Sequence, residues 1–146
     1  MRLKMERCSM NGIDQARQLL IMASKDIKAM HSLLSPESAD DEIFGFHAQQ
    51  AVEKSLKSWI IAAGGNYGFV HDIHVLLLNL RELGCDINRF KSFLLLNVYA
   101  VRLRYEPLEM PTNTLDRHDL LGKVIDLFEQ VQRAVDTAEK LSNFLE

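Results

Sequence analysis

The stretch FHAQQAVEKSLKSWIIAAGG, residues 46–65, decides the fold because a polar segment passes into an apolar run and then stops at two glycines. Asp40 or Asp41 begins this segment, where a carboxylate stabilises the positive end of a helix dipole. Gly64 and Gly65 end it, since glycine readily adopts the left-handed conformation that closes a helix. The sequence therefore predicts a helix from about residue 40 to 63 that carries polar and core-forming side chains close together.

Apolar spacing predicts helices on both sides of this segment. Residues 13–34 carry apolar side chains at alternating steps of three and four, with Asn11 or Ser9 as the cap and Pro36 beyond the end. A shorter helix covers residues 72–83, with a cap near His71 or Asp72 and glycine just past its end. These patterns are typical of helices that pack one face against a core.

The last third of the chain predicts two more helices, separated by a loop that holds two prolines. The first runs from residue 87 or 88 to about 105 and is apolar nearly all round, which favours burial. The second is capped by Thr112 or Thr114 and has apolar residues in heptad spacing at 120, 124, 127, 131, 134, 138, 141 and 145. We expect Phe90, Phe93 and Tyr99 to leave apolar surface for self-association.

The fold class that follows is all-α. No segment alternates with period two between turn signals, so strands are not expected. With 146 residues, 47% of them hydrophobic and 25% charged, the composition is that of one globular domain. We therefore expect residues 1–146 to form a single up-and-down antiparallel bundle of four long helices and one short helix.

Charge and cysteine content limit the partners and the compartment. The net charge of −3 supplies no overall attraction to nucleic acid, so RNA is not an expected partner. The two cysteines, Cys8 and Cys85, form no Cys-x-x-Cys motif, which favours a reducing compartment and hence the cytoplasm. No leader pattern and no run of 18 apolar residues occurs, so we expect neither export nor a membrane span.

The polar residues of the 46–65 stretch form two strips along one helix. Gln49, Glu53 and Lys57 are four residues apart and share a side. His47, Gln50 and Lys54 lie on the neighbouring strip. One interpretation is a solvated face with a Glu53–Lys57 ion pair. The other is a polar pocket in the bundle wall, where Gln50 and Lys54 donate to a phosphate or base edge and Glu53 orients Lys54.

Two other clusters of polar residues have either a chemical or a structural interpretation. His71, Asp72 and His74 include metal-ligating types, but a cap at a helix start is favoured because no second ligand cluster lies nearby, so no metal is expected. Near residue 105, two arginines and two tyrosines complement the end of a helix dipole, or else bind phosphate and stack on a base. These four residues are Tyr99, Arg102, Arg104 and Tyr105.

No standard catalytic motif occurs. Cys85 has no sequence sign of an activating base, and the chain has neither a phosphate-binding glycine loop nor a Gly-x-Ser-x-Gly elbow. We therefore assign no catalytic residue from the sequence.

Three segments in order resemble the HEPN domain family, named for higher eukaryotes and prokaryotes. They are FHAQQAVEKSLKSWIIAAGG at 46–65, HDIHVLLLNL at 71–80 and YAVRLRY at 99–105. The resemblance covers about residues 12–140, and residues 48–57 match the second-helix signature most closely. One departure is Glu106, because the family usually has proline directly after the tyrosine that Tyr105 matches.

The resemblance implies a helical bundle, often dimeric, related to the substrate-binding domain of kanamycin-type nucleotidyltransferases. It also implies a nucleotide ligand such as ATP and a minimal nucleotidyltransferase as the partner. The expected ligand-binding residues are Gln50, Lys54, Arg104 and Tyr105, with Gln49, Glu53, Lys57, His71, Tyr99 and Arg102 in support.

Two alternatives to this non-catalytic module stay open. The superfamily includes ribonuclease toxins that carry an arginine followed by four to six residues and a histidine. No arginine and histidine here have that separation, since Arg104 and His118 lie fourteen residues apart and Arg117 adjoins His118. A ligand-free oligomerisation scaffold is the second alternative.

Overall fold

The protein is helical throughout the part of the chain that the structure, a computed structural model, describes: residues 8–101 and 115–145. Its elements are α1 (Met10–Ser32), α2 (Asp41–Ala62), α3 (Ile73–Glu82), the 3₁₀ segment η1 (Asn88–Leu96), α4 (Asn97–Val101) and α5 (Arg117–Leu145). The all-α prediction is confirmed. Among these residues, no helix has the length and apolar character needed to cross a membrane.

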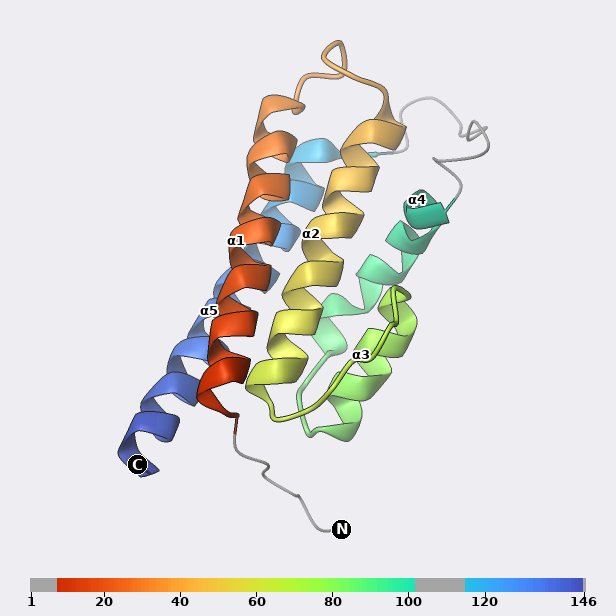
Figure 1. Ribbon diagram of the computed structural model, residues 1–146. Helices are drawn as coiled ribbons and strands as arrows, with labels where there is room; N and C mark the ends of the chain where they lie inside the picture. The colour runs from red at the N-terminus through yellow and green to blue at the C-terminus, as the bar shows by residue number, and fades with distance from the viewer. Residues whose placement is uncertain (1–7, 102–114, 146) are drawn as a thin grey trace.

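Helix α2 is the central element of the bundle. It contacts α1 and α5 on one side and α3, η1 and α4 on the other (Figure 1). Phe44, Val52, Leu56 and Ile60 on this helix are completely buried. Because α2 is covered on nearly every side, its polar side chains have to find partners inside the protein rather than in water.

Helix ends lie where capping chemistry places them. The Ser9 hydroxyl accepts a 3.0 Å hydrogen bond from the Gly12 amide at the start of α1. Asp72 is the cap of α3, because its carboxylate accepts a 2.7 Å bond from the His74 amide. Gly64 follows α2 with a φ of 85°, a conformation that costs glycine little. The cap interpretation of Asp72 is therefore confirmed.

Helix α5 starts later than the sequence predicts and buries a shifted face. It begins at Arg117, and the Asp116 carboxylate accepts a 3.0 Å bond from the Asp119 amide. Thr112 and Thr114, the predicted caps, lie outside the described residues. The buried positions are Arg117, Leu121, Val124, Leu127, Val131, Val135 and Ser142, whereas the predicted positions 141 and 145 are exposed. The predicted positions 124, 127 and 131 are buried, but the buried face is displaced by one residue on both sides of them, to 121 instead of 120, 135 instead of 134 and 142 instead of 141.

The predicted fourth α-helix is wrong in its first half, because residues 88–96 are a 3₁₀ helix. The buried residues of this region are Ile87, Phe90, Phe93, Leu96 and Tyr99, each three residues after the last. A 3₁₀ helix has three residues per turn, so this spacing places Phe90, Phe93 and Leu96 on one side of η1, with Ile87 just before it and Tyr99 in α4 just after it. An α-helix of 3.6 residues per turn would rotate them progressively away from the core.

The expectation that Phe90, Phe93 and Tyr99 leave apolar surface is also wrong. Their exposed fractions are 2%, 2% and 3%. Phe90 packs edge-on against Trp59 with ring centroids 5.7 Å apart, and it stacks on Phe93 at 6.1 Å. The Tyr99 ring lies so close to Gly45 that a Cβ at Gly45 would be 2.6 Å from it. The three aromatic side chains therefore complete the core.

Candidate functional site

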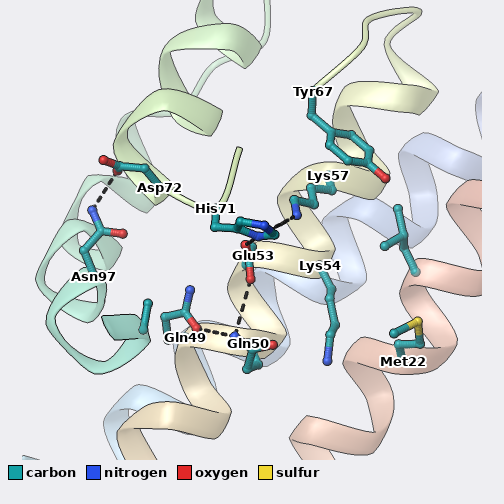
Figure 2. A pocket seen from close by; sticks show the side chains of 12 residues that line it. Met22, Gln49, Gln50, Glu53, Lys54, Lys57, Tyr67, His71, Asp72 and Asn97 are labelled. Carbon is teal, nitrogen blue, oxygen red and sulfur yellow. Dashed lines mark hydrogen bonds and ion pairs between the residues drawn. The ribbon is translucent and has the colours of Figure 1, made fainter. Parts of the chain in front are cut away.

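The polar strips of α2 face a pocket of about 700 Å³, within the range of small-molecule sites. Figure 2 shows its side chains converging from α2, α1, α4 and the segment between α2 and α3. The residues that line it are Leu19, Met22, Gln49, Gln50, Glu53, Lys54, Lys57, Tyr67, His71, Asp72, Asn97 and Ala100. Six of them were predicted from the sequence: Gln49, Gln50, Glu53, Lys54, Lys57 and His71.

The solvated-face interpretation of the Gln49, Glu53 and Lys57 strip is wrong. These residues are 0%, 5% and 9% exposed, because the central position of α2 covers them. Lys57 Nζ lies 3.4 Å from Glu53 Oε1, so the predicted ion pair forms, but inside the bundle wall. A buried ion pair loses hydration and needs further hydrogen bonds to be tolerated.

Glu53 receives those further hydrogen bonds from two neighbours. His71 Nδ1 lies 2.7 Å from Glu53 Oε1, and Gln50 Nε2 donates to Glu53 Oε2 at 3.4 Å. His71 Nδ1 also lies 3.3 Å from Lys57 Nζ, so this nitrogen donates to the Glu53 carboxylate when it carries a proton and accepts from the Lys57 ammonium when it does not. The His71 side chain is 75% exposed, so this hydrogen bond connects the buried Glu53 carboxylate to an imidazole at the pocket rim.

Lys54 is oriented by Asp26 of α1, and not by Glu53 as expected. Lys54 Nζ lies 2.6 Å from Asp26 Oδ2, while His47 Nδ1 lies 3.0 Å from Asp26 Oδ1. Asp26 is only 9% exposed. The sequence holds a signal for it, because residue 26 lies three positions after Ala23 and four before Met30, within the buried stripe of α1.

Tyr67, Asp72 and Asn97 also line the pocket and were not predicted as site residues. The Lys57 ammonium lies 5.1 Å from the centre of the Tyr67 ring, a cation–π distance. Asn97 donates to Asp72 at 2.9 Å and accepts from the Ile73 amide at 3.0 Å, which fastens α4 to the start of α3. No periodic pattern marks these residues, since contacts between distant segments bring them to the pocket.

Four predicted residues are not brought to this pocket by the described structure. Arg102, Arg104 and Tyr105 lie outside the described residues. Tyr99 is buried in the core and does not line the pocket. Burial raises the pKa of the Tyr99 phenol, and the negative charges of neighbouring acidic residues on α2 raise it further.

In the described part of the chain, neither cysteine is activated and no cluster of metal-ligating side chains forms. Burial raises the pKa of Cys8 and of Cys85, so both thiols hold less of the nucleophilic thiolate at neutral pH. Within residues 8–101 and 115–145, no group of three or more His, Cys, Asp or Glu side chains is placed to hold a metal ion.

Comparison with known proteins identifies one family. A family model described as HEPN domain matches residues 16–146, a range that includes every residue lining the pocket. A search of curated proteins found no match, and a search of solved structures found none either.

Proposed function

Because the chain belongs to the HEPN domain family, we propose that it is a non-catalytic module that binds a nucleotide such as ATP. We also propose that it serves as the accessory, substrate-binding subunit of a minimal nucleotidyltransferase. The observation that carries the nucleotide proposal is the pocket along α2. Its size suits a small ligand. Leu19, Met22 and Ala100 supply apolar surface, and the polar wall on α2 consists of Gln49, Gln50, Glu53, Lys54 and Lys57.

Lys54 is the side chain best suited to meet a phosphate. It is 20% exposed and lines the pocket, and the bond to Asp26 uses one of the three N–H groups of its ammonium. The other two are available to a ligand oxygen. We propose that Arg104 and Tyr105 add a bidentate phosphate contact and a ring that stacks on the base.

Calorimetric titration of ATP, GTP, CTP and UTP, with and without the nucleotidyltransferase partner, tests this function. We expect wild type to bind and Lys54→Met to bind roughly ten- to a hundredfold more weakly, since one charge-assisted contact is worth about 1.5–3 kcal/mol. Arg104→Ala should show a loss of the same order. Absence of binding to any nucleotide and to the partner would contradict the proposal.

Two control variants separate a ligand contact from a loss of folding. Asp26→Asn removes the partner of Lys54 but keeps the ammonium, so it should retain most of the affinity. Lys123→Met removes an ammonium that pairs with Asp119 on α5, away from the pocket lining, and should leave binding unchanged. If Lys54→Met binds like wild type but unfolds at a lower temperature, the role of Lys54 is structural.

One observation favours a ribonuclease as the second candidate. The buried Glu53 carboxylate holds His71 through Nδ1, an arrangement that leaves Nε2 free to exchange a proton at the exposed rim. The Arg-x4-6-His motif of the toxins is absent from the sequence, so we expect purified protein to leave single-stranded and structured RNA intact. Cleavage that disappears in His71→Ala or His118→Ala would establish the second candidate instead.

We also propose a cytoplasmic homodimer. Leu141, Phe144 and Leu145 near the end of α5 are 47%, 84% and 52% exposed. Met10, 42% exposed, begins α1 at the same end of the bundle (Figure 1). Burial of these side chains against a second copy would remove apolar surface from water. A dimer that binds neither nucleotide nor partner would favour the scaffold alternative.

A further inference from the structure

The pocket along α2 contains a buried hydrogen-bond donor without a partner. Among buried side-chain atoms of the described residues, Gln49 Nε2 and Ser55 Oγ have no hydrogen-bond partner. Gln49 lines the pocket, whereas Ser55 does not. A buried amide that makes no hydrogen bond destabilises the folded protein. A ligand acceptor at this position would remove that penalty.

Glu53 determines which atom of Gln49 faces the pocket. Because its carboxylate accepts from Gln50 Nε2, Gln50 presents its amide nitrogen and not its oxygen to this region. The same nitrogen donates at 2.6 Å to Gln49 Oε1. Gln49 is thereby held with Nε2 directed away from Gln50, as Figure 2 shows, and this nitrogen lies buried in the wall of the pocket. Reversing either amide would place two donors or two acceptors against each other.

The carboxylate and the amide together present a donor and an acceptor on adjacent turns of α2. Gln50, at 3.4 Å, is the donor bonded to Glu53 Oε2, so this oxygen has capacity to accept another N–H. Every common nucleobase carries an acceptor next to an N–H donor on its pairing edge. The edge of a base therefore matches the pair formed by Gln49 Nε2 and Glu53 Oε2.

The charges in the pocket disfavour a phosphate beside Gln49 and Glu53. Lys57, 11% exposed, is paired with Glu53, so the inner cation is already neutralised. Lys54 is also ion-paired, with Asp26 of α1, but its side chain is more exposed than that of Lys57, at 20% against 11%. Leu19 and Met22 line the pocket, and such apolar surface accommodates the face of a ring better than a hydrated anion.

We infer that the pocket takes a nucleotide base first. The pairing edge of the base meets Gln49 Nε2 and Glu53 Oε2 at the inner end, and the phosphates stay at the rim beside Lys54. This inference rests on the proposed nucleotide-binding function. It adds the orientation of the nucleotide in the pocket. The buried groups recognise the base, and not the phosphate.

The test compares nucleosides, nucleoside triphosphates and inorganic tripolyphosphate in calorimetric titrations. Adenosine, guanosine, cytidine and uridine are measured beside their triphosphates. For whichever base binds wild type, Gln49→Met should weaken the nucleoside and the triphosphate by the same factor, roughly ten- to a hundredfold. Lys54→Met should weaken the triphosphate alone. Tripolyphosphate should bind far more weakly than the triphosphate.

Stability provides the second readout. Gln49→Met removes a nitrogen that has no partner and an oxygen that accepts from Gln50, whose own nitrogen keeps its bond to Glu53, so the unfolding temperature should fall by no more than the few degrees that one hydrogen bond is worth. A larger fall in the unfolding temperature would overturn the inference, because it would mean that the amide nitrogen has a structural partner as well as the oxygen. Gln49→Glu, which keeps the size but turns the donor into an acceptor, should weaken both ligands as Gln49→Met does.

Matched controls make the two possible failures distinguishable. Ser55→Ala removes the other buried group without a partner, outside the pocket lining, and should change neither affinity. If triphosphates bind wild type but Gln49→Met leaves the affinities unchanged, or tripolyphosphate binds as tightly, the base-first orientation is wrong and the proposed function stands. If no nucleoside or nucleotide binds wild type, the proposed function itself fails, and the inference fails with it.

Discussion

Arg117 fastens the start of α5 to the segment between α1 and α2, and its removal should destabilise the whole bundle. Its side chain is 4% exposed. One terminal nitrogen donates to the carbonyls of Leu33 at 2.7 Å and Ser35 at 3.0 Å. The other donates to the Ala39 carbonyl at 2.7 Å and to the Asp41 carboxylate at 2.8 Å. Nε adds a 3.2 Å bond to the same carboxylate.

The magnitude follows from what a substitution leaves behind. Hydrogen bonds to a charged donor are worth about 1.5–3 kcal/mol each, but their sum overstates the loss because water reaches the acceptors once the guanidinium is gone. Asp41 is 31% exposed and can be partly rehydrated. We therefore expect Arg117→Met to cost about 3–5 kcal/mol, the usual penalty for breaking a buried ion pair. At about 2–4 °C per kcal/mol, the midpoint of thermal unfolding should fall by about 6–20 °C.

Thermal and urea unfolding of three variants provide the measurement. Arg117→Lys keeps the charge but loses the planar fork, so its stability should lie between wild type and Arg117→Met. Arg17→Met is the control, because Arg17 bridges Asp136 and Glu139 with a side chain that is 37% exposed. Such a surface pair is worth under about 1 kcal/mol. An Arg117→Met protein within about 1 kcal/mol of wild type would refute this account of Arg117.

Two further predictions concern packing and assembly. Gly45→Ala should destabilise the folded protein by about 1–3 kcal/mol because its Cβ would lie 2.6 Å from the Tyr99 ring. Gly122→Ala should stabilise it by up to about 1 kcal/mol, because no atom lies within 4 Å of the added Cβ. Urea denaturation measures the free energy of unfolding of both variants, and a change of the same sign in the two would contradict the packing argument. Sedimentation velocity at tens of micromolar should show a dimer that Phe144→Asp dissociates and Leu95→Asp, a matched exposed control on η1, does not. A wild-type monomer at that concentration would rule out the dimer.

Local chemistry in the sequence was enough to predict α1, α2 and α3 with their ends. The alternating steps of residues 13–34 follow the 3.6-residue turn of α1. Ser9, Asp72 and Gly64 mark helix ends because their side chains or backbones satisfy terminal groups within a few residues. Such signals depend only on near neighbours in the chain, so they can be read without the fold.

The buried face of η1 follows a period of three that the high apolar density of this region conceals. The apolar residues 87, 90, 93, 96 and 99 repeat with a period of three, which is the period of a 3₁₀ helix. Leu94, Leu95 and Val98 are apolar as well, so on an α-helix the apolar side chains would surround the axis. The period, rather than the density, identified the buried face.

What only the tertiary structure decided is the environment of the polar residues on α2. The sequence placed Glu53, Lys54 and Lys57 on one helix, but it left open whether water or protein surrounds them. Packing of other elements around α2 buried Glu53, brought His71 back beside it, and set Asp26 against Lys54. The physical reason is that burial and ion pairing depend on groups distant along the chain, whose approach is set by the packing of the whole bundle. A periodic pattern within one helix carries no record of that approach.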